Sequence, residues 1–181
     1  ATGSIDADFV ALAGDPPSAF AILAGDDPQL SAALALGAAG GITASAHVAT
    51  AGFARLATAW RNGDAGRARP LGHALARVSA ALFAEPNPTV IKGVLHAQGR
   101  IPTPDVRLPL LPAAPESVEH ALGELSAARE ILEHGPEDVG GAFGRLGLHE
   151  QARDDRGVPV QVFPLLQVER AGQMLDVDDI G

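Results

Sequence analysis

Two short apolar segments, separated by one segment of helix length, constrain the fold of this chain more than any other feature. Residues 20–24 (FAILA) are too few for a helix and lie between turn residues, which predicts a buried strand. Residues 40–44 (GGITA) form a weaker strand candidate, and residues 29–36 between them predict a helix that ends at Gly37. A strand, a helix and a second strand in this order are typical of the parallel βαβ unit of an α/β fold.

The rest of the chain predicts helices rather than further strand–helix repeats. Apolar residues recur at helical spacing, and helices are expected over residues 4–13, 48–62, 64–85, 89–98 and 117–134. Asp64 and Ser117 are the expected N-caps of two of these helices. Residues 135–181 are rich in glycine and charge, and only residues 158–168, interrupted by Pro164, indicate a strand there.

Charge and residue content argue against several classes of protein. The formal net charge of −9 opposes binding to nucleic acid, which requires clustered Lys and Arg. Residues 28–54 carry no charged side chain, but they are mostly small residues with His47 near the middle, so we expect a buried strand between helices and no membrane span. The absence of cysteine excludes disulfides and cysteine nucleophiles, and it predicts a cytoplasmic protein.

Motifs for phosphate, metal and covalent chemistry are weak. The glycine-rich segment 37–41 lacks the Gly-Lys-Ser/Thr ending of a phosphate-binding loop. The six histidines form no His-Glu-x-x-His pattern, so we expect no metal and no cofactor. Lys92 is the only lysine, and its apolar helix makes it either a tuned amine for Schiff-base chemistry or the partner of a carboxylate; the sequence favours the partner.

Polar and small residues follow both predicted strands. Gly25, Asp26 and Asp27 come directly after the first strand, and Ile42 and Thr43 end the second. Because the carboxyl ends of parallel strands meet at one edge of a sheet, where α/β proteins bind ligands, these residues could line a site. The alternative is that the two acids only cap the following helix, with Asp27 as N-cap and proline at the first helical position. Spacing alone leaves both interpretations open.

Four longer motifs resemble one family of enzymes. The motifs LAGDD, ALGAAGGITAS, LFAEPNPTVIKGVLHAQG and RLPLLP occur in the order and spacing of the C-terminal half of the dihydrodipicolinate synthase / N-acetylneuraminate lyase family. The resemblance covers residues 1–132. It implies a (β/α)8 barrel with a helical C-terminal extension, usually assembled as a tetramer. It also implies a class I aldolase, in which a lysine at the end of strand six forms a Schiff base with pyruvate and a tyrosine relays protons.

The same resemblance assigns roles to the strand tips. It makes residues 20–25 strand seven and residues 40–43 strand eight of the barrel. Gly25 and Ile42 match positions that line the pyruvate pocket, and Asp27 matches a position that contacts substrate hydroxyls in the sugar-acid lyases. The implied organisation is C-terminal βα units of the barrel over residues 1–62, a helical extension over 63–134, and a tail over 135–181 that is either disordered or divergent.

Other matches imply that this chain holds no catalytic residue. Lys92 matches a helix position outside the Schiff-base site. The opening residues Ala1-Thr2-Gly3 resemble those that directly follow the Schiff-base lysine, so that lysine is expected upstream of them. The sequence contains no tyrosine. His47 stands where an asparagine is common in the family.

Two hypotheses of different class follow. In the first, the chain is the C-terminal part of an aldolase that acts on pyruvate and an aldehyde or sugar acid once it is joined by the missing N-terminal barrel half. Aspartate semialdehyde and sugar-acid substrates both stay open. In the second, it is a non-catalytic helical interaction module derived from such an enzyme, whose partners are homologous subunits. Neither hypothesis involves nucleic acid, a membrane, a metal or a cofactor.

Overall fold

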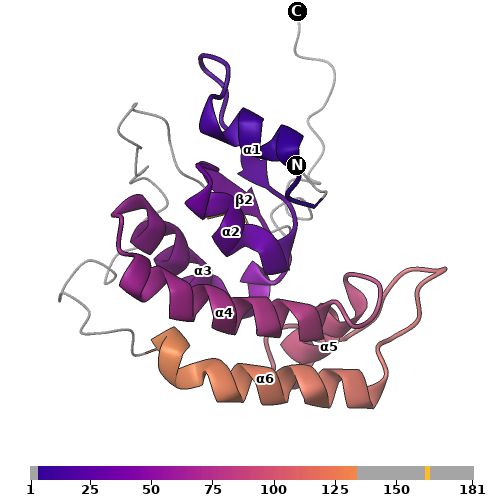
Figure 1. Cartoon of the computed structure of the whole chain (residues 1–181). Helices are drawn as coiled ribbons and strands as arrows, with labels where there is room; N and C mark the ends of the chain where they lie inside the picture. Colours follow the sequence, from indigo (N-terminus) through magenta and orange to yellow (C-terminus); the bar gives the residue numbers. More distant parts are fainter. Residues whose placement is uncertain (1–3, 134–161, 164–181) are drawn as a thin grey trace, which may run out of the picture.

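A computed structural model describes residues 4–133 and 162–163 of the chain (Figure 1). The elements in chain order are α1 (Ala7–Gly14), β1 (Leu23–Ala24), the 3-10 helix η1 (Asp27–Gln29), α2 (Leu30–Ala35), β2 (Gly40–Ile42), α3 (Ala46–Arg61), α4 (Ala65–Leu82), α5 (Thr89–Ala97), α6 (Pro115–Glu133) and β3 (Val162–Phe163). No helix within the described residues is long and apolar enough to cross a bilayer.

The three strands form one short parallel sheet in the order β1-β2-β3. Leu23 pairs with Gly40 and Ala24 with Gly41, so the predicted βαβ unit is confirmed. On its other edge, β2 pairs with β3, which lies within the strand predicted over residues 158–168. The sequence did not indicate that this distant segment would pair with β2. The other predictions for residues 135–181 lie outside the described residues.

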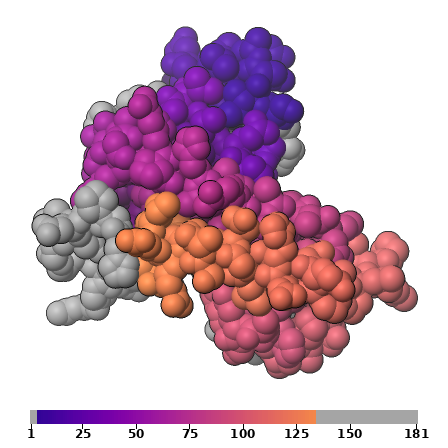
Figure 2. All heavy atoms as spheres, turned by 60° about the horizontal axis from the view of Figure 1, so that its bottom comes forward, coloured from indigo at the N-terminus to yellow at the C-terminus, as the bar shows by residue number. Residues whose placement is uncertain are grey.

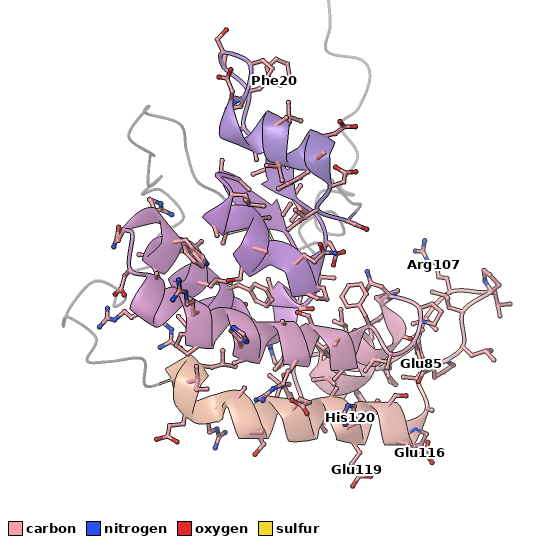
Figure 3. The ribbon with its side chains drawn as sticks, in the orientation of Figure 1. Phe20, Glu85, Arg107, Glu116, Glu119 and His120 are labelled. Atoms are coloured by element: carbon pink, nitrogen blue, oxygen red, sulfur yellow. The ribbon has the colours of Figure 1, made fainter. Side chains whose placement is uncertain are left out.

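The first strand is shorter than its apolar pattern predicts. Only Leu23 and Ala24 are paired, and Phe20 is 67% exposed at the far end of the molecule from α6 (Figure 3). The backbone explains this difference, because Ala19 has a φ of 67° and the N–H of Phe20 closes a turn on the carbonyl of Pro17 at 3.0 Å. The prediction of a buried strand over residues 20–24 is therefore wrong for its first half.

Carboxylates cap two of the helices, α1 and α4. Asp6 caps α1 by accepting the N–H of Phe9 at 2.9 Å. Asp64 caps α4 by accepting the N–H of Arg67 at 3.0 Å, as predicted. The last helix differs, because α6 begins at Pro115 and Ser117 lies inside its first turn. Proline is tolerated in that first turn, where its missing N–H would have no helical partner.

The core continues from the sheet into the helices through α4. On one side α4 packs against η1, α2 and α3, and on the other it packs against α6. Figure 2 shows α6 crossing the face of the molecule between the N-terminal elements and the segment around α5. The first cluster of buried side chains joins α1, the sheet and its helices, and includes Phe9, Leu30, Phe53, Leu56, Leu71 and Leu75. The second joins α4, α5 and α6, and includes Val78, Leu82, Val90, Ile91, Val94 and Leu95.

One hydrogen bond connects α2 to α3 within this core. The indole N–H of Trp60 donates to the hydroxyl of Ser31 at 3.0 Å. Trp60 is itself half-buried against the first core cluster. The bond satisfies both polar groups where the two helices meet, and so it fixes α2 relative to the helix that follows β2.

Candidate functional site

The sheet brings both predicted strand tips to one edge. β1 and β2 are hydrogen-bonded parallel neighbours, so their carboxyl ends lie side by side. Gly25 and Asp26 follow β1, and Thr43 follows β2. The expectation that residues 25–27 and 42–43 gather at one edge is therefore met by the geometry of the strands.

Asp27 connects the two tips directly. Its side chain is almost fully buried, and Oδ2 accepts the backbone N–H of Ser45 at 2.5 Å, across 18 residues of sequence. Ser45 occupies the N-cap position of α3. The carboxylate of Asp27 therefore satisfies a donor at the start of the helix that follows β2.

The alternative prediction, that Asp27 caps the helix directly after it, is wrong. The N-cap position of η1 is Asp26, which makes no side-chain capping bond, and Asp27 is already the first residue of η1. The sequence could not separate these cases, since an acid before Pro28 is a common start for a helix. A serine at the start of α3 was the only local sign that a second helix terminus needed a partner.

Burial and backbone donors act in opposite directions on Asp27. Burial raises the pKa of the Asp27 carboxyl above its ordinary value, because the charged form loses its hydration. The backbone N–H and the side chain of Ser45, followed by the N–H of Ala44, favour the charged form and limit that rise in pKa, while the neighbouring charge of Asp26 adds to it. The Asp27 carboxylate therefore makes its hydrogen bond to the backbone of Ser45 and has little contact with solvent.

Asp26 is held by a second set of bonds on the other side of the tip. Its Oδ2 accepts the side-chain amide of Gln29 at 2.6 Å. The amide oxygen of Gln29 accepts the N–H of Ile5 at 3.1 Å, just before α1. The pattern of charge and strand ends did not single out Gln29. We name the bonds of Asp26, Asp27, Gln29, Ser45 and Ile5 the strand-tip network.

The two faces of β2 have different surroundings. A Cβ on Gly41 would lie 2.6 Å from Cδ1 of Leu30, so this face of the strand is closed by α2. Side chains alternate along a strand, so Ile42 lies on the opposite face, where it is 43% exposed. Thr43 is fully buried, and its hydroxyl oxygen has no hydrogen-bond partner among the described residues. The exposed face therefore presents an aliphatic side chain at the strand end.

His47 lies close behind this edge, in the first turn of α3. It is buried, and burial lowers the pKa of its imidazole below the usual value, with the positive charge of Arg100 adding to the effect. A neutral imidazole is the form that this environment favours. Within the described residues, no group of three or more His, Cys, Asp or Glu side chains is placed to hold a metal ion.

We expect the chain to lose stability as the pH falls through the range where an exposed histidine titrates. Because the native pKa of His47 lies below 6.5, the unfolded chain binds the proton first, and the free energy of unfolding decreases as the pH drops below that value. The His47→Asn variant stays neutral and should show a flatter pH dependence in denaturant titrations between about pH 7.5 and 5.5. Equal slopes for the two chains would contradict this account.

Lys92 lies apart from the strand tips, on α5. Its side chain is half-buried, and no carboxylate of the described residues lies within ion-pair distance of it. The expected carboxylate partner of Lys92 is therefore not found in this part of the chain. The nearby turn is instead stabilised by Thr89, whose hydroxyl donates to the carbonyl of Pro86 at 2.7 Å.

Comparison with known protein families shows to which family the chain belongs. The sequence model of the dihydrodipicolinate synthetase family matches residues 3–128. These residues include both strand tips, the helices α1 to α5 and most of α6. The chain belongs to this family. The resemblance carried by the sequence motifs is thereby confirmed.

Curated family members match the same part of the chain. The 4-hydroxy-tetrahydrodipicolinate synthase of Oleidesulfovibrio alaskensis is 36% identical over 95 residues, which are 52% of this chain and 32% of that protein. The enzyme of the same name from Pseudomonas aeruginosa is 39% identical over 84 residues, 46% of this chain and 28% of that protein. The chain thus spans about a third of the length of these relatives.

Solved structures of family members match the fold. The 4-hydroxy-tetrahydrodipicolinate synthase of Methylacidiphilum fumariolicum aligns with a TM-score of 0.66 and 28% identity, over 73% of this chain and 44% of that one. A chloride-inhibited dihydrodipicolinate synthase of Acinetobacter baumannii, solved with pyruvate, aligns with a TM-score of 0.56 and 32% identity, over 61% of this chain and 38% of that one. The α/β character of the described residues agrees with these neighbours.

Proposed function

We propose that this chain is the C-terminal part of a pyruvate-dependent aldolase or lyase of the dihydrodipicolinate synthetase family. The observation that carries the proposal is the edge where two parallel strand tips meet within the matched residues 3–128. Family members over this region include a dihydrodipicolinate synthase solved with pyruvate. The proposed reaction is condensation of pyruvate with an aldehyde, or the reverse cleavage.

In this proposal, β1 and β2 are the last two strands of the family's barrel. Residues 1–62 are the final βα units, residues 63–134 are the helical extension, and residues 135–181 are a tail, of which Val162 and Phe163 pair with β2. The parallel pairing of β1 and β2 supports this assignment, as does the change from βα order to helices alone after α3. The face of β2 that carries Ile42 lies away from α2, so in this assignment Ile42 would face the barrel interior.

The strand tips are the proposed substrate-binding residues. Gly25 and Ile42 would form part of the wall of the pyruvate pocket, with Asp26 and Thr43 beside them. Gly25 suits such a wall because it has no side chain to block a ligand, and Ile42 is exposed on the face away from α2. Asp27 belongs to the same edge, but its carboxylate is already bonded to Ser45, which supports a role behind the wall.

The chemistry of the proposed reaction needs groups that this chain does not provide at the strand tips. A Schiff base with pyruvate requires a lysine, and the one lysine here, Lys92, lies on α5. This chain also cannot supply a tyrosine as the proton relay, since its sequence contains no tyrosine. We therefore assign the nucleophile and the proton relay to the N-terminal part of the barrel and expect this chain alone to be inactive. A cytoplasmic location remains a prediction.

Complementation tests the proposal. The full chain would be coexpressed with the part of the Oleidesulfovibrio alaskensis relative that precedes its matched segment. We expect formation of 4-hydroxy-tetrahydrodipicolinate from pyruvate and aspartate semialdehyde by the pair, and no turnover by either part alone. The intact relative is the positive control. An inactive pair that nevertheless forms a stable complex would reject the aldolase assignment.

That last outcome would support the second candidate, a non-catalytic helical interaction module. The specific observation in its favour is the loop between α5 and α6, which projects from the molecule near Arg107 (Figure 3). Leu108 and Leu111 in this loop are 85% and 70% exposed, although both are large apolar side chains. Under this alternative, replacing both leucines by serine would abolish binding to the homologous protein.

A further inference from the structure

The bond between the Asp27 carboxylate and the Ser45 N–H lies behind the proposed pocket wall. The bond connects the loop after β1 to the start of α3. The chain between its two partners contains α2 and β2. Both partners are buried, and the acceptor is a carboxylate, which makes a stronger hydrogen bond than a neutral acceptor does. A bond at this position fixes the distance between the two strand tips.

Direct contact of Asp27 with a substrate is poorly compatible with this geometry. The residue is 4% exposed, and its bonded oxygen faces the backbone of α3. Asp26, next to it, is occupied by the side-chain amide of Gln29. Ile42, at the same edge, is more accessible to a ligand than Asp27, because 43% of it is exposed.

We propose that Asp27 is a positioning residue, whose carboxylate holds the tip of β1 against the start of α3 and thereby sets the spacing of Gly25 and Ile42. This inference rests on the proposed function, because it gives those two residues the role of pocket wall. Gly25 lies two residues before Asp27, and Ile42 lies three residues before Ser45. Each wall residue is therefore joined to the bond through a short stretch of backbone.

The strand-tip network makes this role physically reasonable. The carboxylate of Asp26 holds Gln29, which accepts the N–H of Ile5, so the loop after β1 is bonded on both of its sides. Without the Asp27 bond, the N–H of Ser45 would be buried and unpaired, and the loop would be held only on the α1 side. The expected consequence is a movable wall and weaker binding of pyruvate.

Two variants of Asp27 separate positioning from charge. Asp27→Leu has a similar shape but no acceptor, whereas Asp27→Asn retains a carbonyl oxygen that can accept the Ser45 N–H. Asp64→Leu is the matched control, because it removes the same kind of bond from Arg67 at the start of α4. Hydrogen exchange on the full chain alone reports whether each backbone N–H keeps its protection. If Asp27→Leu does not fold, Asp27→Ala replaces it.

The expected result has two parts. In the full chain, Asp27→Leu should speed exchange of the Ser45 amide by about tenfold or more, while Asp27→Asn changes it little. In the complemented pair, Asp27→Leu should raise KM for pyruvate by about tenfold with a smaller change in kcat, and Asp27→Asn should largely restore the wild-type KM. Asp64→Leu should speed exchange at Arg67 and leave KM for pyruvate unchanged.

Three outcomes would overturn the inference. An unchanged KM in Asp27→Leu, together with faster exchange at Ser45, would make the bond merely structural. Equal damage from Asp27→Asn and Asp27→Leu would indicate a substrate contact that needs the negative charge. Unchanged exchange at Ser45 would mean that the bond does not hold the amide. Failure of the proposed function appears differently, as an inactive pair with the wild-type sequence.

Discussion

Replacing Phe53 by alanine is expected to lower the free energy of unfolding by about 3–5 kcal/mol, among the largest losses that one substitution in this chain can cause. Phe53 is fully buried on α3, in the cluster that joins the sheet to its helices. The loss combines the transfer energy of the ring with the cavity left in this cluster, which also contains Leu30 and Leu75. Urea titration of the full chain, followed by circular dichroism, measures it.

Phe20→Ala is the matched control for this prediction. It removes the same ring from a position that is 67% exposed, so the change should stay within about 0.5 kcal/mol. If Phe20→Ala destabilised the chain as much as Phe53→Ala, the buried cluster would not be the origin of stability. The comparison also tests the exposed turn that replaces the first half of the predicted strand.

Gly72→Ala should cost about 1–3 kcal/mol, although alanine is the better helix former. A Cβ at position 72 of α4 would lie 2.6 Å from Cβ of Ser31 on α2. A Cβ cannot rotate away, and the hydroxyl of Ser31 is held by Trp60, so α2 and α4 would have to separate. Because η1 leads directly into α2, this shift would also move the loop that carries Asp27.

Gly123→Ala provides the control in a neighbouring helix. Gly123 lies inside α6, and no atom of the described residues outside this stretch of α6 lies within 4 Å of the place where its Cβ would be. Here we expect stabilisation by roughly 0.5–1 kcal/mol, since alanine loses less backbone freedom on folding. Thermal unfolding of the two variants should therefore shift in opposite directions. A shift in the same direction would contradict the close packing of α2 on α4.

Local chemistry was enough to predict the order of β1, α2 and β2 and the helical character of the segments after them. The apolar pattern predicted the βαβ order, and Asp64 predicted the start of α4, because a carboxylate before a helix satisfies its free N–H groups without help from the rest of the chain. The pattern failed at Phe20, where a turn at Ala19 removes the residue from the strand. The pairing of β2 with β3 joins residues about 120 positions apart, a distance over which sequence periodicity carries no information.

The sequence predicted which residues meet at the edge of the sheet, but not the hydrogen bonds that they make there. Parallel strands put residues 25–27 and 42–43 at one edge whatever their side chains do. The partner of Asp27 could not be predicted, because Ser45 takes part through its backbone N–H, which every residue except proline possesses. The bond between Gln29 and Asp26 could not be predicted either, because an uncharged amide in a polar turn does not stand out in the sequence.

The central claim is that this chain supplies a wall of the pyruvate pocket and no nucleophile. Reduction with borohydride in the presence of pyruvate, followed by peptide mass spectrometry, tests it most directly, because a reduced Schiff base marks the lysine that formed it. We predict no adduct on Lys92, whether the full chain is alone or paired with the N-terminal part of the relative, and an adduct on a lysine of that N-terminal part in the pair. A pyruvate adduct on Lys92 in the chain alone would contradict the account.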